Sequence, residues 1–419
     1  MGNERNWAGN LTYRADRVEH PTSIDDLRAL LAQAEPVRML GSRHCFNDIA
    51  DTDGVLIALD RLPVVFEVSE TRDAVRVAGG LRYGDIAPML ADEGLALANL
   101  ASLPHISVAG AVATGTHGSG DAVGSLARAV RALTIVTPSG ETRELRRGDD
   151  DFDGAVVSLG ALGAVIDLTL EVEPTYDVAQ HVFEHPSWEG ILAYLEAVTG
   201  IGTSVSIFST WRHTDAADQI WVKQRLPEAR EAARASLFES LGAEQAVAKR
   251  HPILGADPVA CTDQLGAPGP WFDRLPHFRL EFTPSAGDEI QSEYLVPRGD
   301  AVAAIQAVRG LAGQIAPLLL VNEIRTVAAD DLWLSPSSGA DAVAIHFTWK
   351  PDEAAVRAFL PTLEAALPPT ARPHWGKVFT LDVAEVRSRY PRFDDFAALA
   401  ARFDPERRLV NPYLERLGL

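Results

Sequence analysis

The sequence predicts an α+β protein made of two modules. Up to about residue 174, short strand and helix patterns alternate with Gly-rich turns, whereas helices alternate with longer apolar strands beyond it. The chain has 419 residues, of which 47% are hydrophobic, and this is enough to form substantial cores. We therefore expect an α/β module first, followed by an antiparallel sheet flanked by helices.

Composition narrows the range of partners. The chain has 38 Lys and Arg against 58 Asp and Glu, a net charge of −20, which disfavours nucleic acid and anionic lipid because both attract cations. The two cysteines, Cys45 and Cys261, lack the spacing of a zinc site. Residues 1–17 carry charges where a signal peptide has its apolar core. We expect a cytoplasmic protein that binds a small molecule and O2, and we infer no metal or protein partner.

Strand and helix signals alternate through the first module. Ser23 precedes apolar residues at helical spacing, and Asp26 follows three positions later, as at a capped helix start. An apolar run over Val37–Leu40 stops at Gly41, which predicts a strand entering a tight loop. Later patterns predict a strand at 74–78, a helix at 83–93, a hairpin joining 132–136 to 141–145, and a strand at 164–172.

Two glycine-rich segments are candidates for ligand binding. In GSRHCFN, residues 41–47, a turn after a strand could point backbone N–H groups at a pyrophosphate. Taken alone, a short Gly-Ser turn is more often only a turn, and the segment is neither GxGxxG nor a P-loop. Residues 107–120 combine four glycines with four hydroxyl side chains, which allows close backbone approach and supplies donors to a ligand. A mobile linker is the alternative there, but linkers rarely include residues such as Ile106, Val108 and Val112.

Polar side chains interrupt apolar strands in the second module. After a helix that Asp300 could cap, strands are predicted at 321–327 and 342–349. Residues two apart share a strand face, so Glu323 lies beside Arg325 and His346 beside Thr348. Such groups are costly to bury without partners, which favours a polar cavity over an ion pair at a sheet edge.

A lone lysine follows in an aromatic context. Residues 374–379, HWGKVF, look like a strand in which Lys377 is the one charged side chain. Desolvation there would lower the pKa of Lys377 and make it a usable base. An exposed lysine at a sheet edge is the alternative.

The chain resembles the alditol (xylitol) oxidases in four segments that occur in the same order: GSRHCFND at 41–48, ASLPHISVAGAVATGTHGSG at 101–120, NEIRTVAAD at 322–330 and RPHWGKVFT at 372–380. These are flavoenzymes with the vanillyl-alcohol-oxidase (PCMH-type) fold, related to the sugar-1,4-lactone oxidases. The resemblance implies a two-part FAD-binding domain at 1–174 and 375–419, with a substrate-binding cap at 175–374.

The resemblance also implies how FAD is held. His44 matches the histidine that bonds covalently to the flavin, and Cys45 stands where related motifs often carry serine. The other implied flavin contacts are Met39, Leu40, Gly41, Ser42, Arg43, Cys45, Ser102, Ser107, Gly110, Thr114, Gly115, Thr116, His117, Val165 and His374.

The substrate side follows from the same resemblance. Ser102, Glu323, Arg325, Thr348 and Lys377 match residues that hydrogen-bond a polyol. The implied reaction passes hydride from the terminal CH–OH carbon to flavin N5, and O2 then becomes H2O2. Lys377 or His346 would take the hydroxyl proton, Arg325 would stabilise the alkoxide, and Glu323 would fix neighbouring hydroxyls and Arg325. Ala101 matches the small residue that leaves oxygen a path.

Two other functions remain open. A sugar-lactone oxidase would share the architecture and the histidine, with less need for His346 and Lys377. A sugar-binding protein without catalysis would be colourless.

Overall fold

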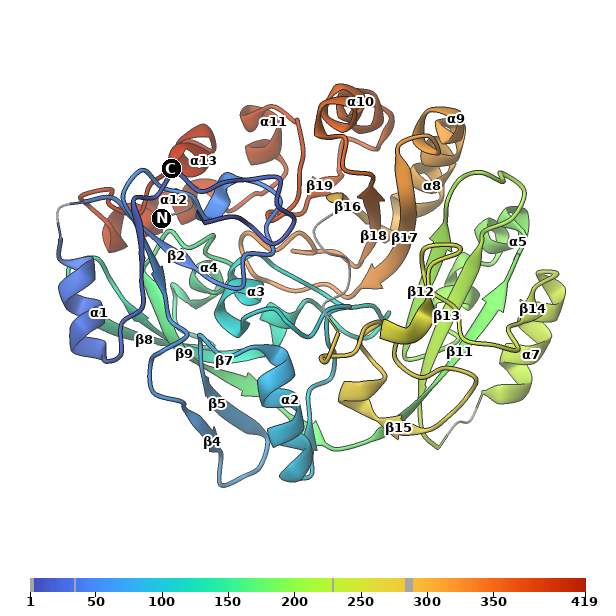
Figure 1. The fold of residues 1–419 in the computed structure, drawn as a ribbon, viewed down its shortest axis with the longest axis horizontal. Coiled ribbons are helices and arrows are strands. Elements are labelled where there is room, and N and C mark those ends of the chain that lie inside the picture. Colours follow the sequence, from blue (N-terminus) through green and yellow to red (C-terminus); the bar gives the residue numbers. More distant parts are fainter. Residues whose placement is uncertain (1–3, 34, 228–229, 283–288) are drawn as a thin grey trace.

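The computed structural model describes residues 4–33, 35–227, 230–282 and 289–419. Its ribbon has two sides (Figure 1). The N-terminal strands and α1–α3 lie on one side, a large antiparallel sheet lies on the other, and the helices of the last hundred residues run along the top. Both sides are mixtures of helix and sheet, so the predicted α+β class is confirmed.

Two small sheets form the N-terminal side. A parallel sheet has the order β1-β3-β2, and an antiparallel sheet has the order β4-β5-β9-β7-β8. Their bounds are β1 Arg17–Glu19, β2 Val37–Leu40, β3 Val55–Ala58, β4 Phe66–Val68, β5 Ala74–Ala78, β7 Val130–Val136, β8 Thr142–Arg146 and β9 Ala164–Glu171. A short ladder, β6 Leu95–Ala96 with β10 Glu173–Pro174, closes this side.

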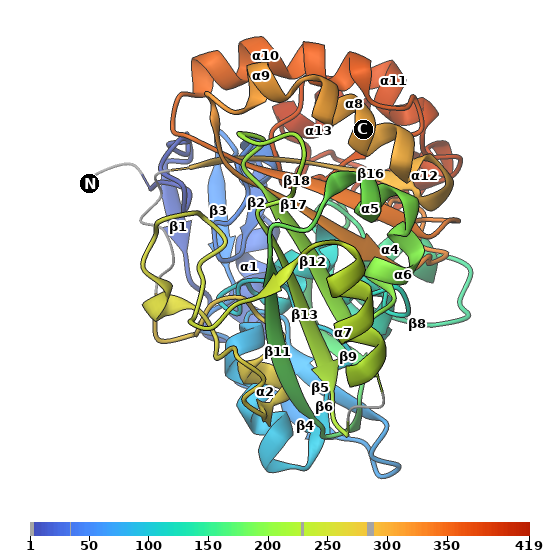
Figure 2. The ribbon, with the colours of Figure 1, turned by 90° about the vertical axis from the view of Figure 1, so that its right-hand side faces the viewer.

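The large sheet has the order β14-β11-β13-β12-β17-β18-β16-β19, with β15 also beside β11. Figure 2 shows its central strands lying next to one another. Its strands are β11 Asp177–Glu184, β12 Ser204–Ser209, β13 Gln219–Arg225, β14 Glu244–Gln245, β15 Gly269–Pro270, β16 Ile290–Pro297, β17 Leu319–Val327, β18 Ala342–Trp349 and β19 Arg372–Pro373.

Helices cover one face of the large sheet. Apolar residues of α5, α6, α8 and α10 share a hydrophobic core with Ile324, Ile345 and Phe347 from β17 and β18. The opposite face is therefore left for polar side chains, because neighbours on a strand point to opposite sides. The helices are α1 Ile24–Leu31, α2 Tyr83–Asp92, α3 Val108–Ala113, α4 Phe152–Val156, α5 Trp188–Ala193, α6 Leu195–Thr199, α7 Glu231–Ser240, α8 Ala301–Gly310, α9 Ala312–Ile315, α10 Glu353–Ala366, α11 Val383–Ser388, α12 Phe393–Phe403 and α13 Pro412–Arg416.

Most predicted elements of regular structure are present. Ser23 accepts a hydrogen bond from the Asp26 N–H at the start of α1. The helix expected after Asp300 is interrupted at Leu311, and the Asp300 carboxylate accepts from Thr370 Oγ1 instead of capping it. The strand predicted at 374–379 was wrong. A turn stands there, in which the Lys377 N–H donates to the His374 carbonyl.

The C-terminal segment returns to the N-terminal side. Asn411 Nδ2 donates to the carbonyls of Asp48, Ile49 and Asp51. The buried Arg38 donates to the Leu409 carbonyl at 3.0 Å. These contacts tie the loop after β2 to residues near the end of the chain. In the part of the chain that the structure describes, no helix combines the length and apolar character needed to cross a bilayer.

Candidate active site

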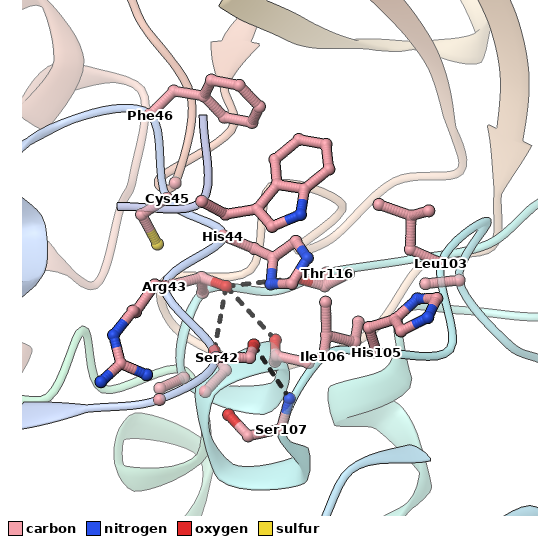
Figure 3. Close-up of a pocket in the computed structure, with 18 of the residues that line it drawn as sticks. Ser42, Arg43, His44, Cys45, Phe46, Leu103, His105, Ile106, Ser107 and Thr116 are labelled. Carbon is pink, nitrogen blue, oxygen red and sulfur yellow. Dashed lines mark hydrogen bonds between the residues drawn. The ribbon is translucent and has the colours of Figure 1, made fainter. Parts of the chain in front are cut away.

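One cavity of about 810 Å³ runs between the two sides of the molecule. Its N-terminal wall is drawn in Figure 3. Every residue that the sequence singled out for cofactor, substrate or oxygen lines it, with the exception of Gly115. Gly115 turns the chain after α3 with a φ of +67°, and a Cβ there would lie 2.9 Å from Pro336 Cδ. Its role in the described structure is that turn.

Two segments meet to form what we call the cradle, residues 41–45 and 107–117. The Ser107 N–H donates to Ser42 Oγ at 3.1 Å (Figure 3). The backbones approach closely, since a Cβ on Gly41 or Gly110 would lie 2.6 or 2.7 Å from Ser107 Oγ. That hydroxyl is buried and has no hydrogen-bond partner among the described residues. The cradle is thus a close-packed wall with a polar atom still to be satisfied.

His44 leaves the cradle toward the middle of the cavity. Arg43, just before it, has a φ of +64°, a left-handed conformation that non-glycine residues rarely adopt. The imidazole stacks against the Trp7 indole, with ring centroids 5.1 Å apart and planes 21° apart. Burial lowers the pKa of His44 to about 4, against a smaller opposing effect of the Ser42 backbone. The ring is therefore neutral at pH 7.

Lys377 reaches the cavity from the turn at 374–377. Asn47 Nδ2 donates to the carbonyls of Trp375 and Lys377, each at 2.8 Å, which fixes this turn against the segment following His44. The Lys377 ammonium lies 4.7 Å from the centroid of the Phe46 ring and donates to Gln291 Oε1. The lysine is partly buried rather than at an exposed edge, and burial lowers its pKa.

The polar face of the large sheet forms the opposite wall. Glu323 and Arg325 on β17, and His346 and Thr348 on β18, line the cavity, and the register pairs Glu323 with His346. Arg325 Nη1 lies 3.4 Å from Ser102 Oγ, and its Nε lies 3.6 Å from Glu323 Oε2. The alternation read from the sequence therefore places these side chains together.

Glu293, Gln291 and His277 are among the polar cavity-lining residues that the sequence analysis did not single out. Glu293 accepts from Arg325 Nη2 at 2.6 Å and lies 3.2 Å from His117 Nε2. Gln291 and Glu293 are two apart on β16, the same spacing that identified Glu323 and Arg325, so this signal was available. His277 lies outside the strands, and no pattern in its neighbourhood marks it.

The charges on this wall support one another. Burial opposes ionisation of Glu293, but Arg325, His117 and His346 outweigh it and hold the pKa of Glu293 well below its usual value. Arg325 and His277 do the same for the pKa of Glu323. Despite burial, the two carboxylates raise the pKa of Arg325. Burial lowers the pKa of His346, with Glu293 acting against it, so a buried cation stands among carboxylates and weakly basic rings.

Two family models match separate parts of the chain. Residues 15–146 match the family model described as an FAD binding domain, and residues 288–417 match the model for D-arabinono-1,4-lactone oxidase. An alditol oxidase from a Streptomyces species is 47% identical over 98% of each chain. This chain belongs to the alditol oxidase family.

Two further similarities extend along nearly the whole chain. An L-gulono-1,4-lactone dehydrogenase from Mycobacterium tuberculosis is 30% identical over 98% of each chain. The crystal structure of cholesterol oxidase from B. sterolicum superimposes with a TM-score of 0.75, covering 99% of this chain and 96% of that one, at 15% identity. That likeness concerns the fold alone, and it agrees with the predicted PCMH-type fold of the alditol oxidase family.

The residues present fit FAD. The cradle belongs largely to the segment matched by the FAD binding model. Its buried Ser107 hydroxyl and His44 Nδ1 lack hydrogen-bond partners among the described atoms, and such atoms in native proteins usually face a ligand or water. The close approach of Gly41 and Gly110 leaves backbone, not side chains, against the cavity.

Proposed function

We propose that this protein is an FAD-dependent alditol oxidase, which oxidises the terminal CH–OH group of linear polyols such as xylitol and sorbitol to the aldose while O2 is reduced to H2O2. The observation that carries the proposal is one continuous cavity joining the cradle to the polar wall of β16–β18. A polyol has a hydroxyl on every carbon, so its recognition needs many convergent donors and acceptors. The relative at 47% identity supports the same function.

Bound FAD would accept the hydride from the substrate and pass the electrons to O2. His44 would attach it covalently, because a neutral imidazole nitrogen is a nucleophile and the Trp7 stack restricts the ring. The cradle residues would hold the rest of the cofactor. Val165 and His374 line the same cavity and would complete its wall.

Substrate recognition falls to the polar wall. Ser102, Glu323, Arg325, Thr348 and Lys377 would hydrogen-bond the polyol. Arg325 keeps its charge through Glu323 and Glu293, so it is suited to stabilise the alkoxide that forms as the hydroxyl loses its proton. Glu323 would hold an adjacent hydroxyl and keep Arg325 in place.

Two groups could take that proton. His346 Nε2 lies 3.3 Å from Thr348 Oγ1, and burial favours its neutral, proton-accepting form. Burial also favours the neutral amine of Lys377. Ala101, 7% exposed and next to Ser102 in the cavity wall, would leave oxygen its path, and a bulkier side chain there would slow turnover with O2.

The domain division also remains a proposal: 1–174 and 375–419 bind FAD, and 175–374 form the cap. Along the chain, β11 is the first strand of the large sheet and β19 is the last. Phe396 of α12 belongs to the same hydrophobic core as Ile86 of α2. Cytoplasmic location, and the lack of nucleic-acid, membrane and protein partners, rest on the sequence composition alone.

A lactone oxidase is the second candidate, because the model matching residues 288–417 carries that description. The deciding experiment mixes the FAD-loaded protein anaerobically with xylitol, sorbitol or a 1,4-lactone and follows flavin absorbance. Rapid bleaching by the polyols, with peroxide produced when air is admitted, is the expected result. Bleaching by the lactone alone would replace the proposal with the second candidate, and a flavin absorbance that neither the polyols nor the lactone changes would reject both.

A further inference from the structure

A buried lysine behind the polar wall contacts a histidine that lines the cavity. Lys223 of β13 is 1% exposed and does not line the cavity. Its Nζ donates to the Leu275 carbonyl and lies 2.9 Å from His277 Nδ1. His277 Nε2 lies 2.8 Å from Glu323 Oε1. A hydrogen-bonded chain thus runs from Lys223 to a carboxylate at the substrate face.

The chemistry of the groups fixes the direction of these bonds. An ammonium can only donate, so His277 Nδ1 accepts and the ring proton resides on Nε2. That N–H then donates to Glu323 Oε1. Burial, followed by the charge of Lys223, lowers the pKa of His277 to about 4, which agrees with a neutral ring. Edge contacts from Phe208 and Trp221, at centroid distances of 5.6 and 5.2 Å, restrict its orientation.

Charge balance gives Lys223 a second effect. Two buried cations, Lys223 and Arg325, stand beside two buried carboxylates, Glu293 and Glu323. Removing Lys223 would leave one uncompensated negative charge in a poorly solvated region, which is costly. Burial lowers the pKa of Lys223 to about 7, with Glu323 acting against it.

We propose that Lys223 and His277 are positioning residues for substrate recognition: the pair holds one oxygen of Glu323 and thereby presents the other to Arg325 and a polyol hydroxyl. The inference rests on the proposed polyol site. It assigns to residues behind the wall a share of the affinity that Glu323 contributes.

The test is a double-mutant cycle at pH 6, where Lys223 carries its charge. Anaerobic rapid mixing of the FAD-loaded protein with xylitol gives the dissociation constant and the limiting rate of flavin reduction separately. Lys223→Met is expected to weaken xylitol binding about tenfold, with the limiting rate changed less than about threefold. Lys223→Met added to Glu323→Gln should change binding less than about twofold, because the carboxylate it positions is gone. Lys350→Met is the control, because this half-buried lysine directly follows β18, donates to the Pro317 carbonyl and does not line the cavity.

A second pair of variants keeps the proposal testable if Lys223→Met does not fold. His277→Gln retains an N–H for Glu323, and His277→Phe does not. Binding should be near the wild-type value in the first and weakened as in Lys223→Met in the second. Equal xylitol affinity in His277→Gln and His277→Phe would overturn the inference. So would a double variant whose loss of affinity equals the product of the losses in Lys223→Met and Glu323→Gln.

Failure of the proposed function gives a different result. If xylitol does not reduce the wild-type flavin, the polyol assignment is lost, and the same cycle is measured with the 1,4-lactone that does reduce it. The inference about Lys223 then stands if Lys223→Met weakens binding of that lactone in the wild-type background but not in the Glu323→Gln background.

Discussion

Three features distinguish the surroundings of His44. Arg43 before it has a left-handed backbone conformation, the Trp7 indole stacks on its ring, and burial lowers its pKa to about 4. Together they favour a fixed, neutral imidazole in the cavity wall. The sequence suggested its importance only through family resemblance. Nothing in its neighbourhood predicts Trp7 as the stacking partner, since that contact joins residues 37 positions apart and depends on the fold.

Replacing His44 by alanine tests the covalent attachment. His44→Ala should give protein whose yellow colour is lost on acid precipitation, because dissociable FAD stays in solution. His105→Ala is the matched control, since His105 also lines the cavity but bonds the Leu280 carbonyl; its precipitate should stay yellow. Equal amounts of precipitated flavin from His44→Ala and wild type would remove His44 as the attachment site.

Replacing Lys377 tests its part in the chemistry. Lys377→Met keeps an unbranched apolar stem against Phe46 but removes the amine. If that amine takes the hydroxyl proton, the limiting rate of flavin reduction should fall by about 100-fold or more, and substrate binding should weaken much less. Rapid mixing measures both quantities. An unchanged reduction rate, together with a large loss in His346→Gln, would assign the proton to His346.

Secondary-structure elements were well predicted where periodicity is regular. The strands at Val37–Leu40, Ala74–Ala78 and Ala342–Trp349 have the predicted bounds, because apolar runs between turn residues leave few alternatives. The segment 374–379 has the same apolar character, yet Asn47 holds the carbonyls of Trp375 and Lys377. A side chain more than 300 positions away takes the hydrogen bonds that a strand neighbour would need, and no local pattern reveals it.

The close approach inside the cradle gives a prediction at the scale of α3. Gly110→Ala would place a methyl group 2.7 Å from Ser107 Oγ and force that hydroxyl away. The variant should retain less FAD after purification, measured as flavin absorbance per protein. In a Ser107→Ala background the nearest other atom to the new methyl is Gly41 Cα at 3.9 Å, so the added loss should disappear. Gly310→Ala on α8, with open space around it, serves as the control.

Across the whole molecule, buried histidines link stability to pH. Burial lowers the pKa of His277 to about 4 and that of His374 to about 3, whereas an unfolded chain has values near 6.5. Between about pH 6.5 and 4 the unfolded state therefore binds more protons, and the free energy of unfolding falls as the pH falls. Urea unfolding at pH 6.5 and 5.0 should record this loss.

A histidine variant isolates the effect. His374→Gln should lose less stability than wild type between these two pH values, by about 1.4 kcal/mol per pH unit for one proton. A loss of stability that is the same in wild type and variant would indicate that His374 is not buried in its neutral form.

The general arrangement of the site could be predicted from the sequence, whereas the residues that hold Glu323 in place could not. The alternation on β17 and β18 predicts a shared polar face, and family resemblance supplies its partners across the cavity. Lys223 and His277 come from two separate segments and reach Glu323 only because the large sheet places β13 near β17. Strand order depends on long-range pairing, which local periodicity does not encode.

The Asn411 side chain donates hydrogen bonds to the carbonyls of Asp48, Ile49 and Asp51, which closely follow the cradle segment 41–45. Asn411 lies 363 positions after Asp48 in the chain. During translation the ribosome therefore releases the cradle long before the side chain that braces it. Flavin should accordingly bind only after residue 411 has been synthesised, and nascent chains halted before that residue should remain colourless.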